Sequence, residues 1–455
     1  MERNIKFKIL VVALSVLLIF STMSFGEEKV EFTLEECIKK ALVVNTDFLL
    51  ATLSAEIAEE KVKESKKNML PKIELYSYIG LVPRARGNAV TFQDDINDYG
   101  SIGGYYQSSL ELKQPIYTFG KILSQQKASE MKLEGEKAKV LGKKEETIFR
   151  IKMLYYDLLL TKELIKLSEE IKNNFEKAAE KSEERIESDD IDITLQDVMK
   201  LKLGLVGAKD ELNRLGHRRQ KLTDSLKFEL GIPAHQGFHI KSKRLKQEKI
   251  ELKKIEDYFD LTLNYKSILK EKKADLNYEK ALVKSSESRY YPDFFIRTGI
   301  EGGVAPNRDD QRNPFVRDDY NYFKADISLG LKWSLDFSLN SSRVRVAKAK
   351  LAKAMAEKEA ISNSLANTIT NTYLEIKETE ERVKLARQAR KVSRTLLVTD
   401  LANFDFGIGE AKDLFESLFI YMRTVKNYLE KIYAYNIAIA QLSFETGKEI
   451  TNLIY

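Results

Sequence analysis

Two histidines, His235 and His239, are the residues whose type and spacing come closest to those of a metal site. Imidazole nitrogens bind transition metals, but a site needs further ligands. Gly237 lies between the two histidines, Pro233 precedes them, and no third ligand is near. The surrounding segment, 234–254, is polar and shows no clear periodicity. We therefore interpret it as a polar loop and predict no metal site.

Motifs that carry catalysis are also missing from the sequence. It has no phosphate-binding Gly-Lys-Ser/Thr loop, no nucleophile elbow and no zinc-ligand spacing. The single cysteine, Cys37, cannot form an internal disulfide. The formal net charge of +6 is too small to imply a nucleic-acid partner. We predict that the protein is not an enzyme, uses no cofactor and binds no nucleic acid.

The first 26 residues have the pattern of a secretory signal peptide. Three basic residues precede an apolar run, Ile9–Phe20, and the small residues Ser24 and Gly26 follow it. The run is about a dozen residues long, shorter than the ~20 that a transmembrane helix needs. We therefore predict cleavage after Gly26 rather than a membrane anchor.

Two stretches of the chain, about 220 residues apart, repeat one pattern. Leu70–Leu75 returns as Tyr291–Ile296, and Leu112–Ile116 returns as Leu331–Leu335. Each copy has a proline-led strand, a polar loop, a second strand and a very long helical segment, so the chain is predicted to be internally duplicated. The predicted divisions are a signal peptide, 1–26; a first repeat, 27–254, with strands at about 72–82 and 105–117, a long hairpin, 118–231, and an equatorial segment, 232–254; and a second repeat, 255–455, with strands at about 293–304 and 322–337, a long hairpin, 340–446, and a C-terminal tail.

The longest predicted elements are two proline-free helices, about 118–186 and 340–406. Each has roughly 70 residues, which at 1.5 Å per residue gives a rod of ~100 Å. Each turns back into a helix of about half its length, which leaves part of the long helix without a partner. The predicted helices at about 46–68 and 263–288 have the length to fill that gap.

Apolar rows on the returning helices recur at alternating steps of four and three, as in coiled coils. The last helix has a second row, shifted by one residue, which favours neighbours on two sides, as in a closed ring of helices. The alternative is a thick amphipathic helix in a simple bundle. The rows are Val198, Leu201, Leu205, Ala208, Leu212, Leu215, Leu222 and Leu226; Leu414, Leu418, Tyr421, Val425, Tyr428, Ile432, Tyr435, Ile439 and Leu442; and Phe415, Phe419, Met422, Leu429 and Tyr433.

The strand predicted at 322–337 alternates apolar and polar residues almost without exception. Apolar-out and charged-in strands of this length are typical of outer-membrane barrels with a wet lumen. The alternative is a soluble sheet with one face on a core, but the neighbouring helices are too long and too charged to cover that face. The predicted lipid-facing residues are Phe323, Ile327, Leu329, Leu331 and Trp333.

The number of strands then constrains the assembly. Four strands cannot close a barrel, and an open sheet edge is not viable in lipid. A dimer would give an eight-stranded barrel with a filled interior. We therefore expect a trimer: a fold that is mainly α with a transmembrane β part, in which three subunits with four strands each form a 12-stranded β-barrel, continued by a long α-helical coiled-coil tunnel.

At this point the chain resembles the TolC family of outer-membrane efflux channels along nearly the whole mature sequence. The residues that carry the resemblance are Phe32–Leu42, Leu70-Pro71, Gln114–Lys121, Phe404–Gly407 and Asp413–Glu416. The resemblance implies a homotrimer in the outer membrane that extends into the periplasm. It also implies that a periplasmic adaptor (membrane fusion) protein and an inner-membrane transporter dock at the hairpin tips.

The resemblance also assigns roles to residues near the tips. Asp413 and Glu416 match acids that ring a closed periplasmic aperture, and Asp197 takes the comparable place in the first hairpin. The alternative for the two acids is a favourable interaction with the helix dipole. A tyrosine–arginine latch of the family matches Phe404 and Gly409, so closure is expected to rest on other contacts. The predicted tip residues for docking and gating are Ser188, Asp189, Asp190, Phe404, Gly407 and Gly409.

Together these features predict an exit duct of a tripartite efflux or secretion system in the outer membrane. Two alternatives are a periplasmic coiled-coil adaptor and a structural envelope protein without a pore. An adaptor would carry one hairpin flanked by small β domains, and a structural coiled coil would lack alternating strands. The paired, alternating strands of this sequence disfavour both.

Overall fold

The computed structural model describes residues 30–85, 97–187, 194–310 and 319–451. The chain divides into two compact units, a helical unit and a sheet unit. The helical unit comprises Met1–Phe48, Lys144–Thr262 and Thr368–Tyr455, and the sheet unit comprises Leu49–Lys143 and Leu263–Asn367. Both units therefore combine segments from the two halves of the sequence. The two longest helices, α4 (Lys121–Glu187) and α8 (Phe337–Asp405), each contribute residues to both units.

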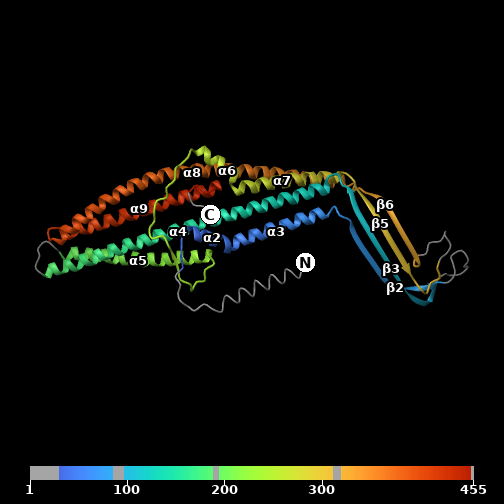
Figure 1. The fold of residues 1–455 in the computed structure, drawn as a ribbon, viewed down its shortest axis with the longest axis horizontal. Coiled ribbons are helices and arrows are strands. Elements are labelled where there is room, and N and C mark those ends of the chain that lie inside the picture. The colour runs from blue at the N-terminus through green and yellow to red at the C-terminus, as the bar shows by residue number, and fades with distance from the viewer. Residues whose placement is uncertain (1–29, 86–96, 188–193, 311–318, 452–455) are drawn as a thin grey trace. The chain divides into compact units, whose positions relative to one another are not determined.

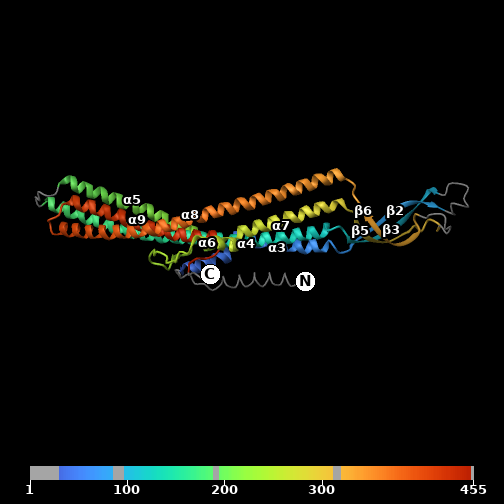
Figure 2. The same ribbon diagram turned by 90° about the horizontal axis from the view of Figure 1, so that it is seen from above.

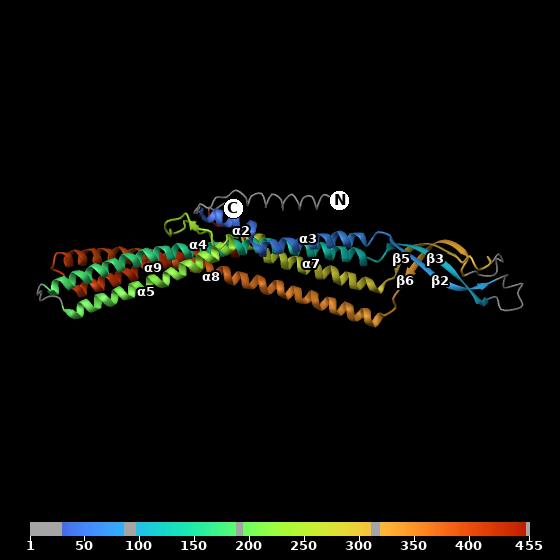
Figure 3. The ribbon, with the colours of Figure 1, turned by 90° about the horizontal axis from the view of Figure 1, so that it is seen from below.

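The sheet unit contains four antiparallel strands in the order β2-β3-β5-β6 (Figure 1). Figure 3 shows the same strands from below. The strands are β2 (Lys72–Ala85), β3 (Asn97–Tyr117), β5 (Asp293–Val304) and β6 (Tyr322–Lys332). The pairing of β3 with β5 joins the two halves of the sequence in one sheet. β2 and β6 form its edges.

Three strand boundaries differ from the sequence prediction. β2 and β3 are longer than predicted, with a register shift between Pro83 and Arg84. β6 ends at Lys332 rather than at 337, and α8 already begins at Phe337. Lys332 pairs with Asp293, the first residue of β5, and the preceding Pro292 has no N–H to extend the ladder. Residues after Lys332 therefore have no partner strand.

Four helical segments accompany the sheet: α3 (Thr46–Lys67), α7 (Ser267–Glu287) and the first parts of α4 and α8. Small residues allow close approach, because a Cβ added to Gly135 of α4 would lie 3.6 Å from Ala274 of α7. Ion pairs link α8 to α7, with 3.1 Å between Lys348 and Glu287. The shorter helices thus lie alongside the long ones, as their lengths predicted.

The helical unit contains α5 (Leu195–Glu229), α9 (Ala411–Thr446) and the second parts of α4 and α8, which run alongside one another (Figures 1 and 2). All members of the main buried cluster belong to this unit. The predicted row of α9 from Leu414 to Leu442 is buried except for the half-buried Tyr428. Coiled-coil packing of the returning helices is therefore confirmed.

Several short elements of the helical unit were not predicted. β1 (Val30–Phe32) and β4 (Phe238–Ile240) form a two-stranded parallel sheet. The helix predicted at about 263–288 corresponds to α7, which begins at Ser267 and which a 3₁₀ turn, η1 (Ser288–Tyr290), follows. The helix before it, α6 (Ile255–Tyr265), was not predicted. The helices separate at Lys266, whose backbone is extended (φ −61°, ψ 122°). The order α6, α7 matches α2 (Leu34–Val44), α3 earlier in the chain.

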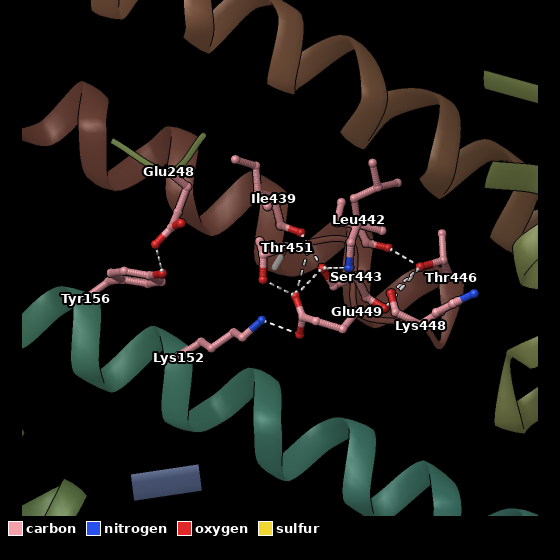
Figure 4. Close-up of polar contacts among 11 residues, drawn as sticks. Lys152, Tyr156, Glu248, Ile439, Leu442, Ser443, Thr446, Lys448, Glu449 and Thr451 are labelled. Atoms are coloured by element: carbon pink, nitrogen blue, oxygen red, sulfur yellow. Dashed lines mark hydrogen bonds and ion pairs between the residues drawn. The ribbon is translucent and has the colours of Figure 1, made fainter. Parts of the chain in front are cut away.

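Residues 241–254, here called the strap, contain neither helix nor strand and are held by side chains of the neighbouring helices. The buried Asn436 of α9 accepts from the Glu248 amide at 3.0 Å and donates to the Lys246 carbonyl at 2.8 Å. The hydroxyl of Tyr156 donates to the Glu248 carboxylate at 2.8 Å (Figure 4). The two bonds of Asn436 satisfy backbone groups of the strap that have no partner in a helix or a strand.

The end of α9 is fastened to α4 by a buried ion pair. The Lys152 side chain is 2% exposed, and its Nζ lies 2.6 Å from the Glu449 carboxylate. The other oxygen of that carboxylate accepts from Ser443 at 3.2 Å and from the Thr451 hydroxyl at 2.6 Å (Figure 4). Glu449 is thereby fixed where it compensates a buried charge.

Within the described residues, no single helix combines the length and the apolar composition needed to cross a membrane. The pair α2 and α3, which meet at a bend of 46°, passes that test when taken together.

Candidate functional site

The two histidines lie apart from any cluster of metal ligands. His235 and His239 are exposed, and His239 belongs to β4, where it pairs with Glu31. Among the described residues, no group of three or more His, Cys, Asp or Glu side chains is arranged to hold a metal ion.

One face of the four-stranded sheet is apolar from edge to edge. Residues that pair directly across antiparallel strands lie on the same face, and the pairs Leu75–Leu110, Leu110–Ile300 and Ile296–Leu329 connect all four strands. On β6 these side chains are largely uncovered: Ile327 is 76% exposed and Leu329 73%. The apolar face comprises Ile73, Leu75, Ile79, Leu81, Tyr106, Leu110, Leu112, Phe294, Ile296, Ile300, Phe323, Ala325, Ile327, Leu329 and Leu331.

The predicted lipid-facing residues fall on this face with one exception. Phe323, Ile327, Leu329 and Leu331 belong to β6 and are exposed. Trp333 lies just beyond the end of β6, and its indole N–H donates to the Tyr290 carbonyl at 3.1 Å. A tryptophan with a bonded polar edge at a strand end is typical of the boundary of an apolar surface.

The opposite face of the sheet is charged and cross-linked by ion pairs. Arg297 of β5 lies 3.3 Å from Glu111 of β3 and 3.1 Å from Asp326 of β6, so one guanidinium bridges three strands. Gly299 makes room for this bridge, since a Cβ there would lie 2.5 Å from the Asp326 carboxylate. Lys324 and Glu301 pair at 3.4 Å. The sheet thus separates an apolar surface from a polar one.

Both edges of the sheet are open in the single chain. Among the described strands, none pairs with the outer edge of β2 or of β6, and only an isolated bridge between Ala85 and Arg308 covers the far end of β2. Unpaired edge groups can hydrogen-bond to another strand. Each edge therefore carries backbone groups that a further strand could pair with.

Asp413 and Glu416 lie in the first turns of α9, away from its buried row. Both are exposed, whereas Leu414 and Leu418 beside them are fully buried. Neither carboxylate forms an ion pair with a described residue. The acids therefore share one outward face of the helix, and their charges are not neutralised within the chain.

Asp197, the counterpart in the first hairpin, has a local role. Its carboxylate accepts from the Thr194 hydroxyl at 2.6 Å and forms the reciprocal capping box at the start of α5. The Thr194 side-chain hydrogen bond is the main reason that the pKa of Asp197 lies below its usual value, and the nearby Lys200 lowers it further. Ser188, Asp189 and Asp190 lie outside the described residues.

The turn between α8 and α9 has no room for a latch side chain at its end. Gly407 has a positive φ of 79°, a conformation that suits glycine. A Cβ at Gly409 would lie 2.7 Å from the Phe404 backbone nitrogen. Phe404 itself is only 1% exposed and belongs to the core. Phe404 and Gly409, the positions matched to the tyrosine–arginine latch, are thus packed inside the turn.

Two cationic side chains of α4, which sequence reasoning missed, bind this turn instead. Lys181 lies 3.1 Å from the Asp405 carboxylate and also donates to the Asp405 carbonyl at 2.7 Å. Arg185 donates to the Gly407 carbonyl at 3.4 Å. Both cations lie 5.8 Å from the centre of the Phe404 ring. These contacts connect the end of the first long helix to the turn that follows the second.

Comparisons with known proteins address the fold. Neither models of protein families nor curated protein sequences gave a match. Solved structures did. The chain is similar to the outer-membrane channel OprN, with 13% identity, a TM-score of 0.76 and 94% of each chain covered. It is similar to the outer membrane protein VceC of Vibrio cholerae, with 14% identity, a TM-score of 0.75, and 92% of this chain and 96% of that one covered.

A third similar structure is the CmeC outer membrane channel of Campylobacter jejuni, with 14% identity and a TM-score of 0.74. The match covers 94% of this chain and 91% of the CmeC chain. In all three cases the likeness spans helices and strands together, and the sequence identity is low. The chain therefore has the fold of outer-membrane channel proteins.

Proposed function

We propose that this protein is an outer-membrane channel in which three copies together form a 12-stranded barrel and a helical tunnel, the exit duct of an efflux or secretion system. The observation that carries the proposal is the four-stranded sheet with one exposed apolar face and two open edges. In water such a face would be a liability, whereas in lipid it is the required surface. The channel fold of the similar structures supports the same function.

The open edges support assembly from several copies. A bilayer offers no hydrogen-bond partners to the edges of β2 and β6, so they must pair with other strands. Joining β6 of one subunit to β2 of the next satisfies both edges in a closed ring. Three subunits give twelve strands, enough for a lumen lined by the Arg297 face.

Exposed apolar stripes in the helical unit support the same symmetry. Leu195, Met199, Leu203 and Val206 recur along α5 at helical spacing, and all are exposed. Leu385, Val392 and Leu396 form an exposed stripe on α8. In the predicted second row of α9, Phe419 remains 51% exposed. A second and a third copy of the chain are the proposed cover for these stripes.

We further propose that the chain arose by internal duplication, with a signal peptide over 1–26 and repeats over 27–254 and 255–455. Support comes from the order of elements: a short helix, a longer helix, two strands, a very long helix and a returning helix occur twice. Removal of the signal peptide would release a protein that reaches the outer membrane and extends into the periplasm.

The tips are the proposed site of gating and docking. Three copies of Asp413 and Glu416 would ring the periplasmic aperture, with Asp197 nearby. The turns around Ser188–Asp190 and Phe404–Gly409 would meet a periplasmic adaptor protein and, through it, an inner-membrane transporter. Because the latch positions are Phe404 and Gly409, the grip of Lys181 and Arg185 on the second turn is the proposed means of holding the closed state.

Cysteine cross-linking at the sheet edges tests the assembly. Tyr76 of β2 and Ser328 of β6 both lie on the polar face and would be replaced together by cysteine. Within one chain they are three strand spacings of about 4.8 Å apart, too far for a direct disulfide. Oxidation or short bifunctional linkers should therefore produce covalent trimers in vesicles. Each single variant is the control, and it should give no trimers. Intact monomers from the inserted double variant at every linker length would contradict the proposal.

A further inference from the structure

The strap is a positively charged surface segment without helix or strand that the channel proposal does not use. Seven of its fourteen residues are basic and two are acidic. Its apolar residues Leu245, Ile250 and Leu252 turn toward the core of the helical unit. All its cations are exposed: Lys241, Lys243, Arg244, Lys246, Lys249, Lys253 and Lys254.

None of these seven cations forms an ion pair with a residue in the described parts of the chain. This differs from the helices, where lysine and arginine commonly pair within a turn, as Lys384 does with Glu380 at 3.0 Å and Arg214 with Glu211 at 2.6 Å. Of the two acids, Glu248 already accepts from Tyr156. The strap therefore presents positive charge that the chain itself does not neutralise.

The backbone of the strap is held in place, so these charges are preorganised. The Tyr155 hydroxyl lies 2.8 Å from that of Ser242 at one end. At the other end the Tyr373 hydroxyl donates to the Lys253 carbonyl at 3.1 Å. Asn436 fixes the middle. A charged loop with a fixed backbone loses less entropy on binding than a mobile one.

Cations of the neighbouring helices add to the positive potential. Lys162 of α4 donates to the Ile240 carbonyl at 3.4 Å. Lys166 donates to the Lys243 carbonyl at 3.1 Å, but its charge is paired with Glu163 at 3.0 Å. Arg387 of α8 donates to Gln247 of the strap at 2.9 Å. Burial, and then the neighbouring cations, hold the pKa of Lys162 below its usual value.

A pocket of about 440 Å³ opens beside the strap, with apolar and aromatic residues at its floor and cations at its rim. This volume is at the lower end of the range of ligand pockets, and it has room for one large side chain. The lining residues are Leu34, Tyr155, Tyr156, Leu159, Ser242, Lys243, Arg244, Lys246 and Glu248.

We propose that the strap is a docking surface for an extended acidic segment of a partner protein, with one aromatic or aliphatic residue of that segment in the pocket. Carboxylates of the segment pair with Lys243, Arg244 and Lys246. The apolar pocket favours a polypeptide over a purely anionic polymer, because a polymer of charges alone would leave the pocket empty. Buried anchors beside a charged rim are the usual arrangement of such interfaces. The proposal does not depend on the channel function.

The test uses the purified full chain and a fluorescein-labelled synthetic peptide of alternating glutamate and glycine with one central phenylalanine. Fluorescence anisotropy should report binding that weakens as salt is added. The triple substitution K243Q/R244Q/K246Q should weaken binding about tenfold or more at low salt. These side chains are exposed, so the melting temperature should stay unchanged. The control K132Q/K137Q/K384Q removes the same charge from helical ion pairs and should leave binding intact.

Three variants of the probe separate the alternatives. Replacing the peptide's phenylalanine by glycine should weaken binding through loss of the anchor, and replacing its glutamates by glutamine should abolish it. Equal binding by the triple variant, or by the glutamine peptide, would overturn the docking surface. Polygalacturonate that binds as tightly as the phenylalanine peptide would overturn the protein partner in favour of an anionic polymer.

Discussion

Lysines placed on the apolar face of β6 distinguish a sheet in lipid from a sheet in water. Ile327 and Leu329 are about three-quarters exposed. In a water-soluble protein, Ile327→Lys and Leu329→Lys would change stability by no more than about 0.5 kcal/mol each. In a bilayer each lysine costs about 2–4 kcal/mol near the midplane, so the pair costs roughly 4–8 kcal/mol per chain if the sites act independently.

The assay is the fraction of protein that inserts into lipid vesicles as a trimer, measured after refolding from denaturant. Since about 1.4 kcal/mol corresponds to tenfold in an equilibrium constant, the double variant should show almost no inserted trimer. The matched control, Tyr76→Lys/Tyr78→Lys, adds the same charge on the opposite face, where Tyr76 pairs with Ser109 and Tyr78 with Gln107, and should insert normally. Normal insertion of the double variant would refute the assignment of this face to lipid.

Three further predictions concern the helical unit. Replacing both Asp413 and Glu416 by alanine should weaken the block of channel current by a trivalent cation added from the periplasmic side, because about six like charges around an aperture attract cations. The measurement is a single-channel recording. Unchanged block would show that these acids do not line the aperture and only occupy the first turns of a helix. Glu449→Gln should lower the free energy of unfolding by about 3–5 kcal/mol, because it removes the carboxylate that compensates the buried charge of Lys152. In a denaturant titration, the Lys152→Met/Glu449→Leu double variant should show most of this loss recovered. Burial raises the pKa of Cys37 to about 12, so the thiol stays protonated and should resist iodoacetamide at pH 8 until the protein is unfolded; rapid native labelling would contradict its burial.

The long elements could be predicted because their patterns persist. Alternation over ten or more residues of β6 fixes which face is apolar, and a proline-free run fixes each long helix. The end of β6 could not be predicted, since it is set by Pro292 at the start of another strand rather than by residues of β6. Three-residue strands such as Val30–Phe32 are too short for any period. The break at Lys266 lacks the proline or glycine that marks most helix ends.

The candidate site was only partly visible in the sequence. The resemblance to a known family singled out Asp413 and Glu416, which also lie off the apolar rows. Lys181 and Arg185 did not stand out, because cations recur every few residues along α4 and their partners lie more than 200 residues away in the chain. The clash at Gly409 likewise depends on how the turn folds back on Phe404. Such contacts follow from packing and carry no local signal.

Single-channel recording of the purified protein in a planar bilayer tests the central claim most directly. A trimeric channel should produce discrete conductance steps. In its closed form the conductance should be small and the current should be carried mainly by cations. The variant with lysine in place of Ile327 and Leu329 should produce no steps. Protein that is demonstrably inserted and trimeric yet passes no current under any applied voltage would contradict the account.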